Sequence, residues 1–221
     1  MNDSMPSSSD KTRALADNIP TQLKRLSTWM TCGGDSGKAA TDSKGVKADR
    51  HLPSNHRDFE SALAECLKRG NGLGLVLPVG YSCFDCDDAF YPADDPLHPG
   101  QLKRWFKPLV ARTDSYTERS LSGNGLHIFV ESAVSPDGEK EALTFPDGSK
   151  LELLGPGHFV RVTGDLYEGK TREIKNHTDI VTQSLKEIRE KREAQEPSTK
   201  PKTTTPPMTD EEILVQLQTS G

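Results

Sequence analysis

Two apolar segments that lie close together in the chain constrain its fold most strongly. Residues 72–78 and 81–87 carry almost continuous apolar side chains, and a short turn containing a glycine separates them. Strands that are apolar on both faces are typical of the centre of a sheet that is covered on both sides. The sequence therefore predicts two central strands, the second of which ends in Asp85 and Asp87.

These two aspartates are candidate metal ligands. Side chains alternate between the two faces of a strand, so Asp85 and Asp87 project from the same face. Neighbouring carboxylates repel each other and stay ionised most easily beside a cation. Oxygen ligands on a rigid strand suit Mg²⁺ or Mn²⁺, with substrate phosphates completing the coordination. A solvated strand end is the alternative explanation of an isolated Asp-x-Asp.

A second candidate site is the segment from Ser122 to His127, which contains Gly123 and Gly125. The glycines let the backbone take positive φ and approach a ligand closely, and consecutive amides in such a turn can bind an anion. The Ser122 hydroxyl adds a donor. His127 opens the strand 126–131 on the face opposite its apolar residues, so it need not be part of the core and can donate to a phosphate oxygen. The alternative is a glycine hairpin with an incidental histidine.

Glu152 is a third candidate carboxylate. It alternates with Leu151 and Leu153 in the expected strand 150–154, so its side chain lies on the other face. A lone charged residue in an apolar strand is costly to bury unless it is paired or bound to a metal. An exposed strand face remains the alternative.

The composition excludes several classes of protein. No apolar run approaches the length of a membrane span, and the polar N-terminus does not resemble a secretory signal. Cys83 and Cys86 lie in one strand and face opposite sides, so they do not form a zinc or redox pair, and four cysteines do not suggest a disulfide framework. We expect a cytoplasmic protein with no membrane contact. The net charge of −5 argues against a basic coat, yet permits a local basic groove.

The remaining segments predict a domain with tails at both ends. We expect disorder over 1–14, one catalytic domain over 15–192, a Pro/Thr/Lys linker over 193–208, and the start of a truncated helical module over 209–221. Within the domain the predicted helices begin at 19, 58, 101 and 177, and Pro108 is expected to end the third. Further strands are expected at 27–31, 116–120, 126–131 and 158–163, a mobile loop at 32–55 and an acidic excursion at 134–148.

The order of these motifs resembles a known family. Asp-x-Asp comes first, then the turn ending in His127, then Glu152, and then the strand from His158 to Thr163. Over about residues 18–170 this is similar to the N-terminal primase-polymerase (Prim-Pol) domain of the archaeo-eukaryotic primase superfamily, as found in phage and plasmid replication proteins. The resemblance implies an α+β fold, with an RRM-like antiparallel catalytic sheet, flanking helices and an N-terminal α/β unit.

The resemblance also implies roles for individual residues. Two divalent ions, Mg²⁺ or Mn²⁺, would be held by Asp85, Asp87 and Glu152. The incoming triphosphate would contact a second set of residues, namely Ser122, Gly123, Gly125, His127 and His158. The last of these stands where such domains usually carry arginine.

The implied function is that of a DNA primase/polymerase, which transfers nucleotides from dNTPs or NTPs onto a primer on a single-stranded DNA template. The resemblance also implies a helicase, either as a downstream domain or as a separate subunit. Three alternatives stay open: a catalytically silent DNA-binding module, a metal-dependent nucleotide-sugar transferase, and a metal nuclease.

DNA contacts are expected from two groups of basic residues. The first group is Lys103, Arg104, Lys107 and Arg112, and the second, in the loop 32–55, is Lys38, Lys44, Lys47 and Arg50.

Overall fold

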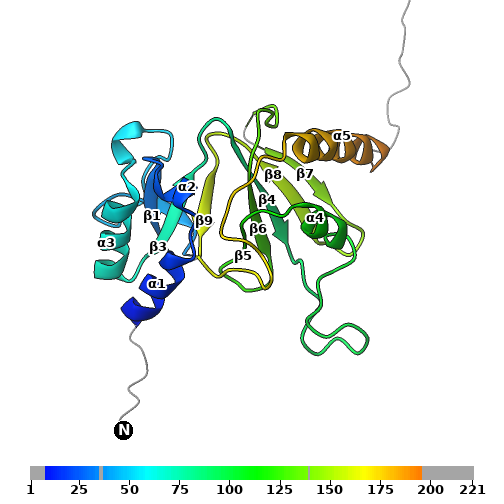
Figure 1. The fold of residues 1–221 in the computed structure, drawn as a ribbon, viewed down its shortest axis with the longest axis horizontal. Coiled ribbons are helices and arrows are strands. Elements are labelled where there is room, and N and C mark those ends of the chain that lie inside the picture. The colour runs from blue at the N-terminus through cyan, green and yellow to red at the C-terminus, as the bar shows by residue number, and fades with distance from the viewer. Residues whose placement is uncertain (1–7, 35–36, 139, 196–221) are drawn as a thin grey trace, which may run out of the picture.

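The computed structural model describes residues 8–34, 37–138 and 140–195, and its described strands form two antiparallel sheets that stand side by side (Figure 1). The four-stranded sheet has the order β2 (Ala39–Thr41), β1 (Trp29–Gly33), β3 (Gly72–Val76), β9 (Phe159–Val162). The five-stranded sheet has the order β5 (Thr117–Arg119), β6 (Leu126–Glu131), β4 (Tyr81–Asp87), β8 (Lys150–Leu154), β7 (Lys140–Thr144). The fold is α+β, as the resemblance to the Prim-Pol family implied.

The two apolar segments occupy central strands, but of different sheets. β3 lies between β1 and β9, whereas β4 lies between β6 and β8. The short turn between them is therefore the point where the chain passes from one sheet to the other. An apolar strand pattern shows that a strand is buried, and it does not show which neighbours the strand pairs with.

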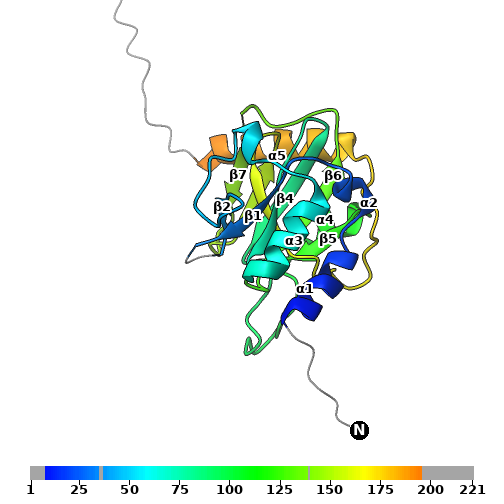
Figure 2. The same cartoon turned by 90° about the vertical axis from the view of Figure 1, so that its left-hand side faces the viewer.

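Helix α3 (Phe59–Arg69) covers the outer face of the four-stranded sheet (Figure 2). Asp58 caps it by accepting a hydrogen bond from the Ser61 amide at 2.8 Å, and Gly70 ends it with φ of 70°. Phe59 packs edge-on against Trp29 of β1, with 5.1 Å between ring centroids. These features match the helix expected from the sequence.

The predicted disorder over 1–14 does not hold for residues 8–14, and residues 1–7 lie outside the described part of the chain. Helix α1 (Ser8–Asp17) starts within that range, and α2 (Thr21–Lys24) follows it. Ala16 is buried, and the Asn18 side-chain amide donates to the Gly164 carbonyl at 3.0 Å. These contacts hold the C-terminal end of α1 and the residue after it against the domain.

Three further expectations are wrong. Pro108 lies in the first turn of α4 (Lys107–Arg112) and does not end a helix. Amides in the first turn of a helix make no hydrogen bond within the helix, so a proline there loses no such bond. The expected excursion 134–148 contains β7, which pairs with β8 and buries Leu143. The expected loop 32–55 contains β2 and the 3₁₀ turn Pro53–Asn55.

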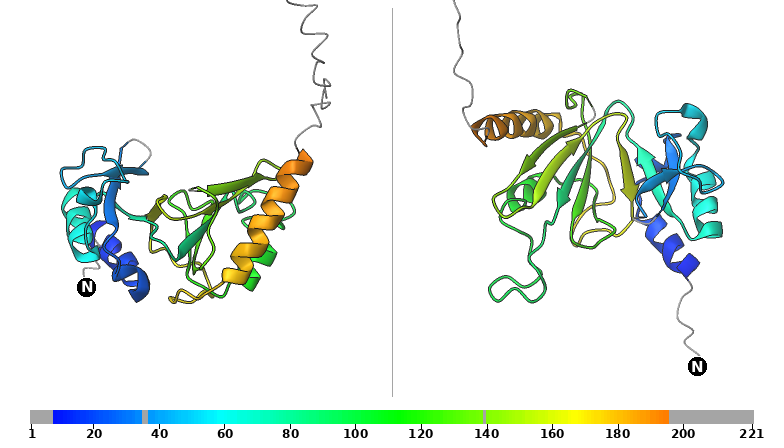
Figure 3. Two further views of the ribbon diagram at one scale, coloured as in Figure 1. Left: turned by 90° about the horizontal axis from the view of Figure 1, so that it is seen from above. Right: turned by 180° about the vertical axis from the view of Figure 1, so that it is seen from behind.

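Helix α5 (Thr178–Gln195) and α4 cover one face of the five-stranded sheet, which we call the back face. Figure 3 shows α5 on the side of this sheet that is turned away from the four-stranded sheet. Phe84, Ile128 and Leu153 point to the back face and pack with Val181 of α5. The opposite, front face buries Cys83, Phe129 and Leu154 in a second cluster that includes the core of the four-stranded sheet.

The expected linker over 193–208 overlaps α5, which continues to Gln195, and the rest of the linker and the expected C-terminal module lie outside the described residues. No helix in the described part of the chain has the length and apolar character needed to cross a membrane.

Candidate active site

Strand register aligns four polar side chains in a row across the front face of the five-stranded sheet. Glu118 of β5 lies opposite His127 of β6, and His127 lies opposite Asp85 of β4. Asp85 in turn lies opposite Glu152 of β8. Residues opposite each other on antiparallel strands have side chains on the same face, so segments far apart in sequence contribute to one site. We call these four residues the polar row.

Asp85 is the central carboxylate of the polar row. Its side chain is 22% exposed, and Oδ1 accepts no hydrogen bond among the described residues. Nε2 of His127 lies 3.7 Å from that oxygen. Burial raises the pKa of Asp85 above its usual value; the His127 ring opposes this rise, and the neighbouring Asp87 and Glu152 add to it.

Asp87 and Glu152 complete a group of three carboxylates on the front face. Asp87 follows Asp85 by two residues and lies opposite Lys150. Glu152 is 18% exposed, and its Oε1 accepts a hydrogen bond from Lys140 Nζ at 2.9 Å. Among the described residues, no three acidic, histidine or cysteine side chains are already arranged as a ligand set. The backbone thus brings the three carboxylates together, while Lys140 holds one of them.

The glycine turn that follows β5 is fixed beside the end of β4. The Ala89 amide donates to the Asn124 carbonyl at 2.8 Å, and the Asn124 side chain donates to Asp88 at 3.0 Å. Gly125 allows the close approach, because a Cβ atom there would lie 2.8 Å from the Cys86 carbonyl oxygen. Ser122 and Gly123 are exposed at the tip of the turn, and Gly123 has φ of 75°.

His127 is more enclosed than the sequence suggested. The residue is only 7% exposed, although its side chain belongs to neither of the two hydrophobic clusters. Its Nδ1 lies 3.0 Å from Oε1 of Glu118. Burial lowers the pKa of His127, but the hydrogen bond to Glu118 and the charge of Asp85 outweigh burial and raise it above its usual value.

Glu118 is the residue of this site that the sequence analysis missed. It is fully buried, and it lies in the expected strand 116–120 where a single acidic residue gives no distinct signal. One sequence signal was available. Glu118 lies in the strand before the glycine turn and His127 in the strand after it, and a hairpin pairs residues on the two sides of its turn.

Comparison with known proteins shows that the chain is similar to a phage enzyme. The DNA primase-polymerase of Nitratiruptor phage NrS-1 is 33% identical to this chain over 153 residues, which cover 67% of this chain. The aligned part of the chain belongs to the phage-type Prim-Pol family. The match covers 20% of the phage protein, so the chain spans about a fifth of the relative. No protein-family model matches the chain.

The four-stranded sheet presents a second surface of the Prim-Pol domain. Gly72 and Gly74 leave room for the side chains of Arg161 and Phe159, because a Cβ atom at either glycine would lie within 2.5 Å of them. Arg161 donates a hydrogen bond to the Gly37 carbonyl. The positive charge of the neighbouring Lys38 favours a lower pKa of both Asp85 and His127, so the loop before β2 acts electrostatically on the polar row.

A cavity of about 410 Å³ lies beside this loop, and several of its lining residues are basic. It is bordered by Lys38, Lys47, Arg50, His51 and Phe159. Three of the four basic loop residues expected to contact DNA thus lie around one cavity, together with an aromatic ring. His158 precedes β9 in the four-stranded sheet, so it does not belong to the polar row.

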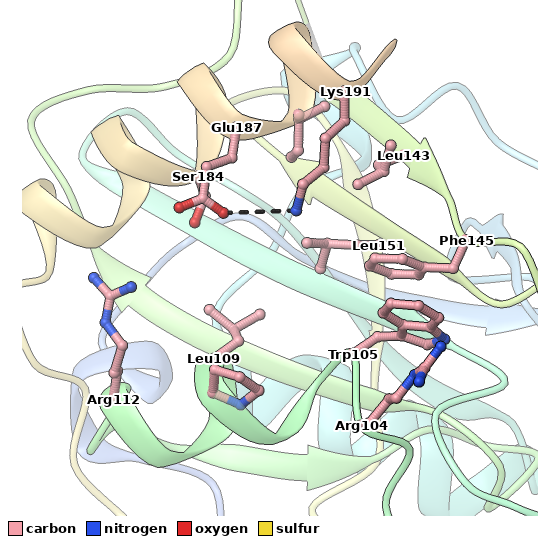
Figure 4. Close-up of a pocket in the computed structure, with 12 residues that line it drawn as sticks. Arg104, Trp105, Leu109, Arg112, Leu143, Phe145, Leu151, Ser184, Glu187 and Lys191 are labelled. Atoms are coloured by element: carbon pink, nitrogen blue, oxygen red, sulfur yellow. Dashed lines mark ion pairs between the residues drawn. The ribbon is translucent and has the colours of Figure 1, made fainter. Parts of the chain in front are cut away.

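Two of the other expected DNA contacts lie on the back face, whereas Lys103 pairs with Asp147 and Lys107 lines a separate cavity with Tyr91 and His98. Arg104 and Arg112 line a cavity of about 280 Å³ between α4, α5 and the back of the sheet, shown in Figure 4. Trp105 stacks on Phe145 at one end of this cavity, with 5.2 Å between ring centroids, and Leu151 forms part of its wall. Since Leu151 and Glu152 project from opposite faces, these arginines are separated from the carboxylates by the sheet.

Proposed function

We propose that this Prim-Pol domain catalyses template-directed nucleotidyl transfer from dNTPs or NTPs onto a strand annealed to single-stranded DNA. The observation that carries the proposal is the polar row, in which His127, Asp85 and Glu152 lie opposite one another in turn, with Asp87 on the same face. The name of the phage relative, DNA primase-polymerase, supports the same reaction class.

The donor set fits divalent cations. Three carboxylates occupy one face, and the buried Oδ1 of Asp85 accepts no hydrogen bond among the described residues. We propose that Asp85, Asp87 and Glu152 hold two Mg²⁺ or Mn²⁺ ions. Such ions, when bound, lower the pKa of an attacking hydroxyl and stabilise the leaving pyrophosphate. Lys140 supplies the positive charge at Glu152 in the present arrangement.

The chain's own residues would bind and orient the triphosphate. The exposed tip of the glycine turn offers the Ser122 hydroxyl and the amides around Gly123, which suit phosphate oxygens. Nε2 of His127 faces Asp85 from the neighbouring strand, so a phosphate held beside that carboxylate is within reach of the ring. Positioning and electrostatic stabilisation account for most of the catalysis in phosphoryl transfer.

We propose that the template strand passes along the cavity beside β2. Lys47 and Arg50 would contact its phosphates, and Phe159 offers a ring on which a base can stack. A helicase domain or subunit acting downstream remains a proposal that depends on the Prim-Pol resemblance alone.

One assay tests the reaction. The full chain is incubated with labelled nucleotides and single-stranded DNA, with and without a primer, in Mg²⁺ or Mn²⁺. We expect template-dependent products from wild type and none from Asp85→Ala or Asp87→Ala. Asp94→Asn, which changes an exposed loop carboxylate, is the matched control and should retain wild-type activity.

Each alternative function predicts a different result in this assay. Nucleotide consumption without template would favour the nucleotide-sugar transferase, and shortened DNA would favour a nuclease. DNA binding without metal-dependent nucleotide binding would favour the silent module. Products that persist in Asp85→Ala would contradict the assignment of the site.

A further inference from the structure

Glu118 is held by four hydrogen bonds in the interior of the domain. Oε1 lies 3.0 Å from Nδ1 of His127 and accepts from the Thr163 amide, also at 3.0 Å. Oε2 accepts from the Tyr116 hydroxyl at 2.7 Å and from the Gly164 amide at 2.9 Å. The side chain is fully buried, so these donors replace all of its hydration.

This arrangement fixes which nitrogen of His127 faces the site. An amide can only donate, so the Thr163 and Gly164 amides require both Glu118 oxygens to act as acceptors. Burial and the neighbouring Glu118 hold the pKa of the Tyr116 hydroxyl well above its usual range, so this group donates too. We therefore assign the hydrogen of this bond to Nδ1 of His127, which donates to Glu118, and Nε2 is then directed at Asp85.

The same carboxylate links the two sheets. Thr163 and Gly164 directly follow β9 of the four-stranded sheet, whereas Glu118 and His127 belong to the five-stranded sheet. Gly164 also lies against α1, since a Cβ atom there would be 2.1 Å from the Leu15 carbonyl oxygen. Movement of β9 relative to the polar row would therefore disturb the hydrogen bond that holds His127.

We propose that Glu118 is a positioning residue of the nucleotide site, which locks the ring of His127 through Nδ1 so that Nε2 faces the triphosphate. The proposal depends on the proposed function, because it takes His127 to contact the incoming nucleotide. Glu118 itself touches neither substrate nor ions. A histidine whose second nitrogen is bound by a carboxylate keeps one orientation and one tautomer, which reduces the reorganisation needed when a ligand binds.

The first test is kinetic and uses Glu118→Gln in the full chain. Glutamine keeps the volume of the side chain. Its NH₂ group replaces one of the two accepting oxygens, so in either orientation of the amide it faces groups that donate to Glu118 in the wild type. We expect the KM for the nucleotide to rise by about tenfold, as when the partner of a ligand histidine is removed, with a smaller change in kcat. Glu141→Gln is the matched control, because Glu141 is also a buried glutamate of this sheet but is held by Arg189 and Arg192 on the back face. We expect its KM to be unchanged.

A double-mutant cycle separates positioning from a merely structural role. If Glu118 acts through His127, Glu118→Gln should raise KM in wild type and have no further effect in His127→Ala. An equal effect in both backgrounds would overturn the proposal. If His127→Ala leaves KM unchanged, the proposed role of His127 fails and the Glu118 proposal fails with it. If His127→Ala raises KM and Glu118→Gln does not, only the Glu118 proposal fails.

The second test observes His127 directly in the wild-type protein and does not depend on activity. ¹⁵N NMR of histidine-labelled wild type, with His127 assigned from the His127→Ala spectrum, should show a hydrogen-bonded, protonated Nδ1 in the absence of nucleotide. A bare Nδ1 would overturn the proposal whatever the activity of the protein. In folded Glu118→Gln we expect this resonance to move, whereas in Glu141→Gln it should stay in place.

Discussion

Asp85 and Glu152 lie directly opposite each other on β4 and β8, in the interior of the five-stranded sheet. Both carboxylates are mostly buried, and each has a basic group beside it: Nε2 of His127 lies 3.7 Å from Asp85, and Lys140 donates a hydrogen bond to Glu152. Two like charges at such a position lower the stability of the fold, and proteins keep this kind of arrangement at functional sites. The opposed pair is therefore better explained by ligand binding than by folding.

Asp85→Asn should remove activity and increase stability. Loss of the central carboxylate should lower nucleotide incorporation by about 100-fold or more, comparable to losing one key electrostatic group of an active site. Burial raises the pKa of Asp85, so its ionised form is disfavoured in the folded protein, and the neutral amide removes this penalty. We expect the Tm without divalent ions to rise by a few degrees, measured by differential scanning fluorimetry. Adding Mn²⁺ should raise the Tm of wild type and leave the Tm of the variant unchanged. A variant less stable than wild type without divalent ions would contradict the view that the ionised Asp85 destabilises the fold.

Gly125→Ala should destabilise the fold more than Gly123→Ala. The added Cβ at 125 would meet the Cys86 backbone oxygen at 2.8 Å, and a backbone atom of a central strand cannot move aside easily, so we expect a loss of about 1–3 kcal/mol, as for an overpacked core. At 123 the space is open, and only the positive φ is strained, at about 1 kcal/mol. Urea unfolding of both variants measures the difference. A larger loss at 123 would show that the turn is not held against β4 as described.

The alternation of side chains along a strand was sufficient to predict which face Asp85, Asp87 and Glu152 occupy. It could not predict the strand register, which pairs Asp85 with Glu152 and not with the adjacent Leu151. Glu118 was missed for the same reason, since its significance lies in its cross-strand partner and in two amides more than forty residues away in the chain.

The errors in secondary structure have similar causes. Pro108 satisfies the local rules for both the start and the end of a helix, and tertiary packing of Val110 decides between them. Residues 140–144 are too polar to predict a strand, yet Glu141 becomes buried because Arg189 and Arg192 of α5 neutralise it. Both cases depend on contacts with α5 or the sheet that no local pattern contains.

Asp147 should make the stability of the domain fall at low pH. Burial raises its pKa, but hydrogen bonds from the Ser149 hydroxyl and amide and the charge of Lys103 outweigh burial and lower it to about 2. The folded state therefore binds a proton less readily than the unfolded state, so this contribution to stability is present above about pH 4 and is lost as the pH falls toward 2. We expect the difference in unfolding free energy between wild type and Asp147→Asn to shrink over that range in urea titrations. A difference that is independent of pH would show that the Asp147 carboxylate does not titrate in this way.

Charge reversals in the cavity beside β2 and on the back face of the five-stranded sheet should identify the path of the DNA. Lys47→Glu and Arg50→Glu alter the cavity beside Lys38 and the polar row, so each should weaken binding of single-stranded DNA in fluorescence anisotropy. Each should also reduce the slope of log affinity against log salt by about one, as expected when one phosphate contact is lost. Arg104→Glu and Arg112→Glu alter only the back face and should leave affinity and slope unchanged. If these two variants weaken binding instead, the strand runs over the back face, where Trp105 and Phe145 would stack with its bases, and the template could not reach the carboxylates without passing around the edge of the sheet.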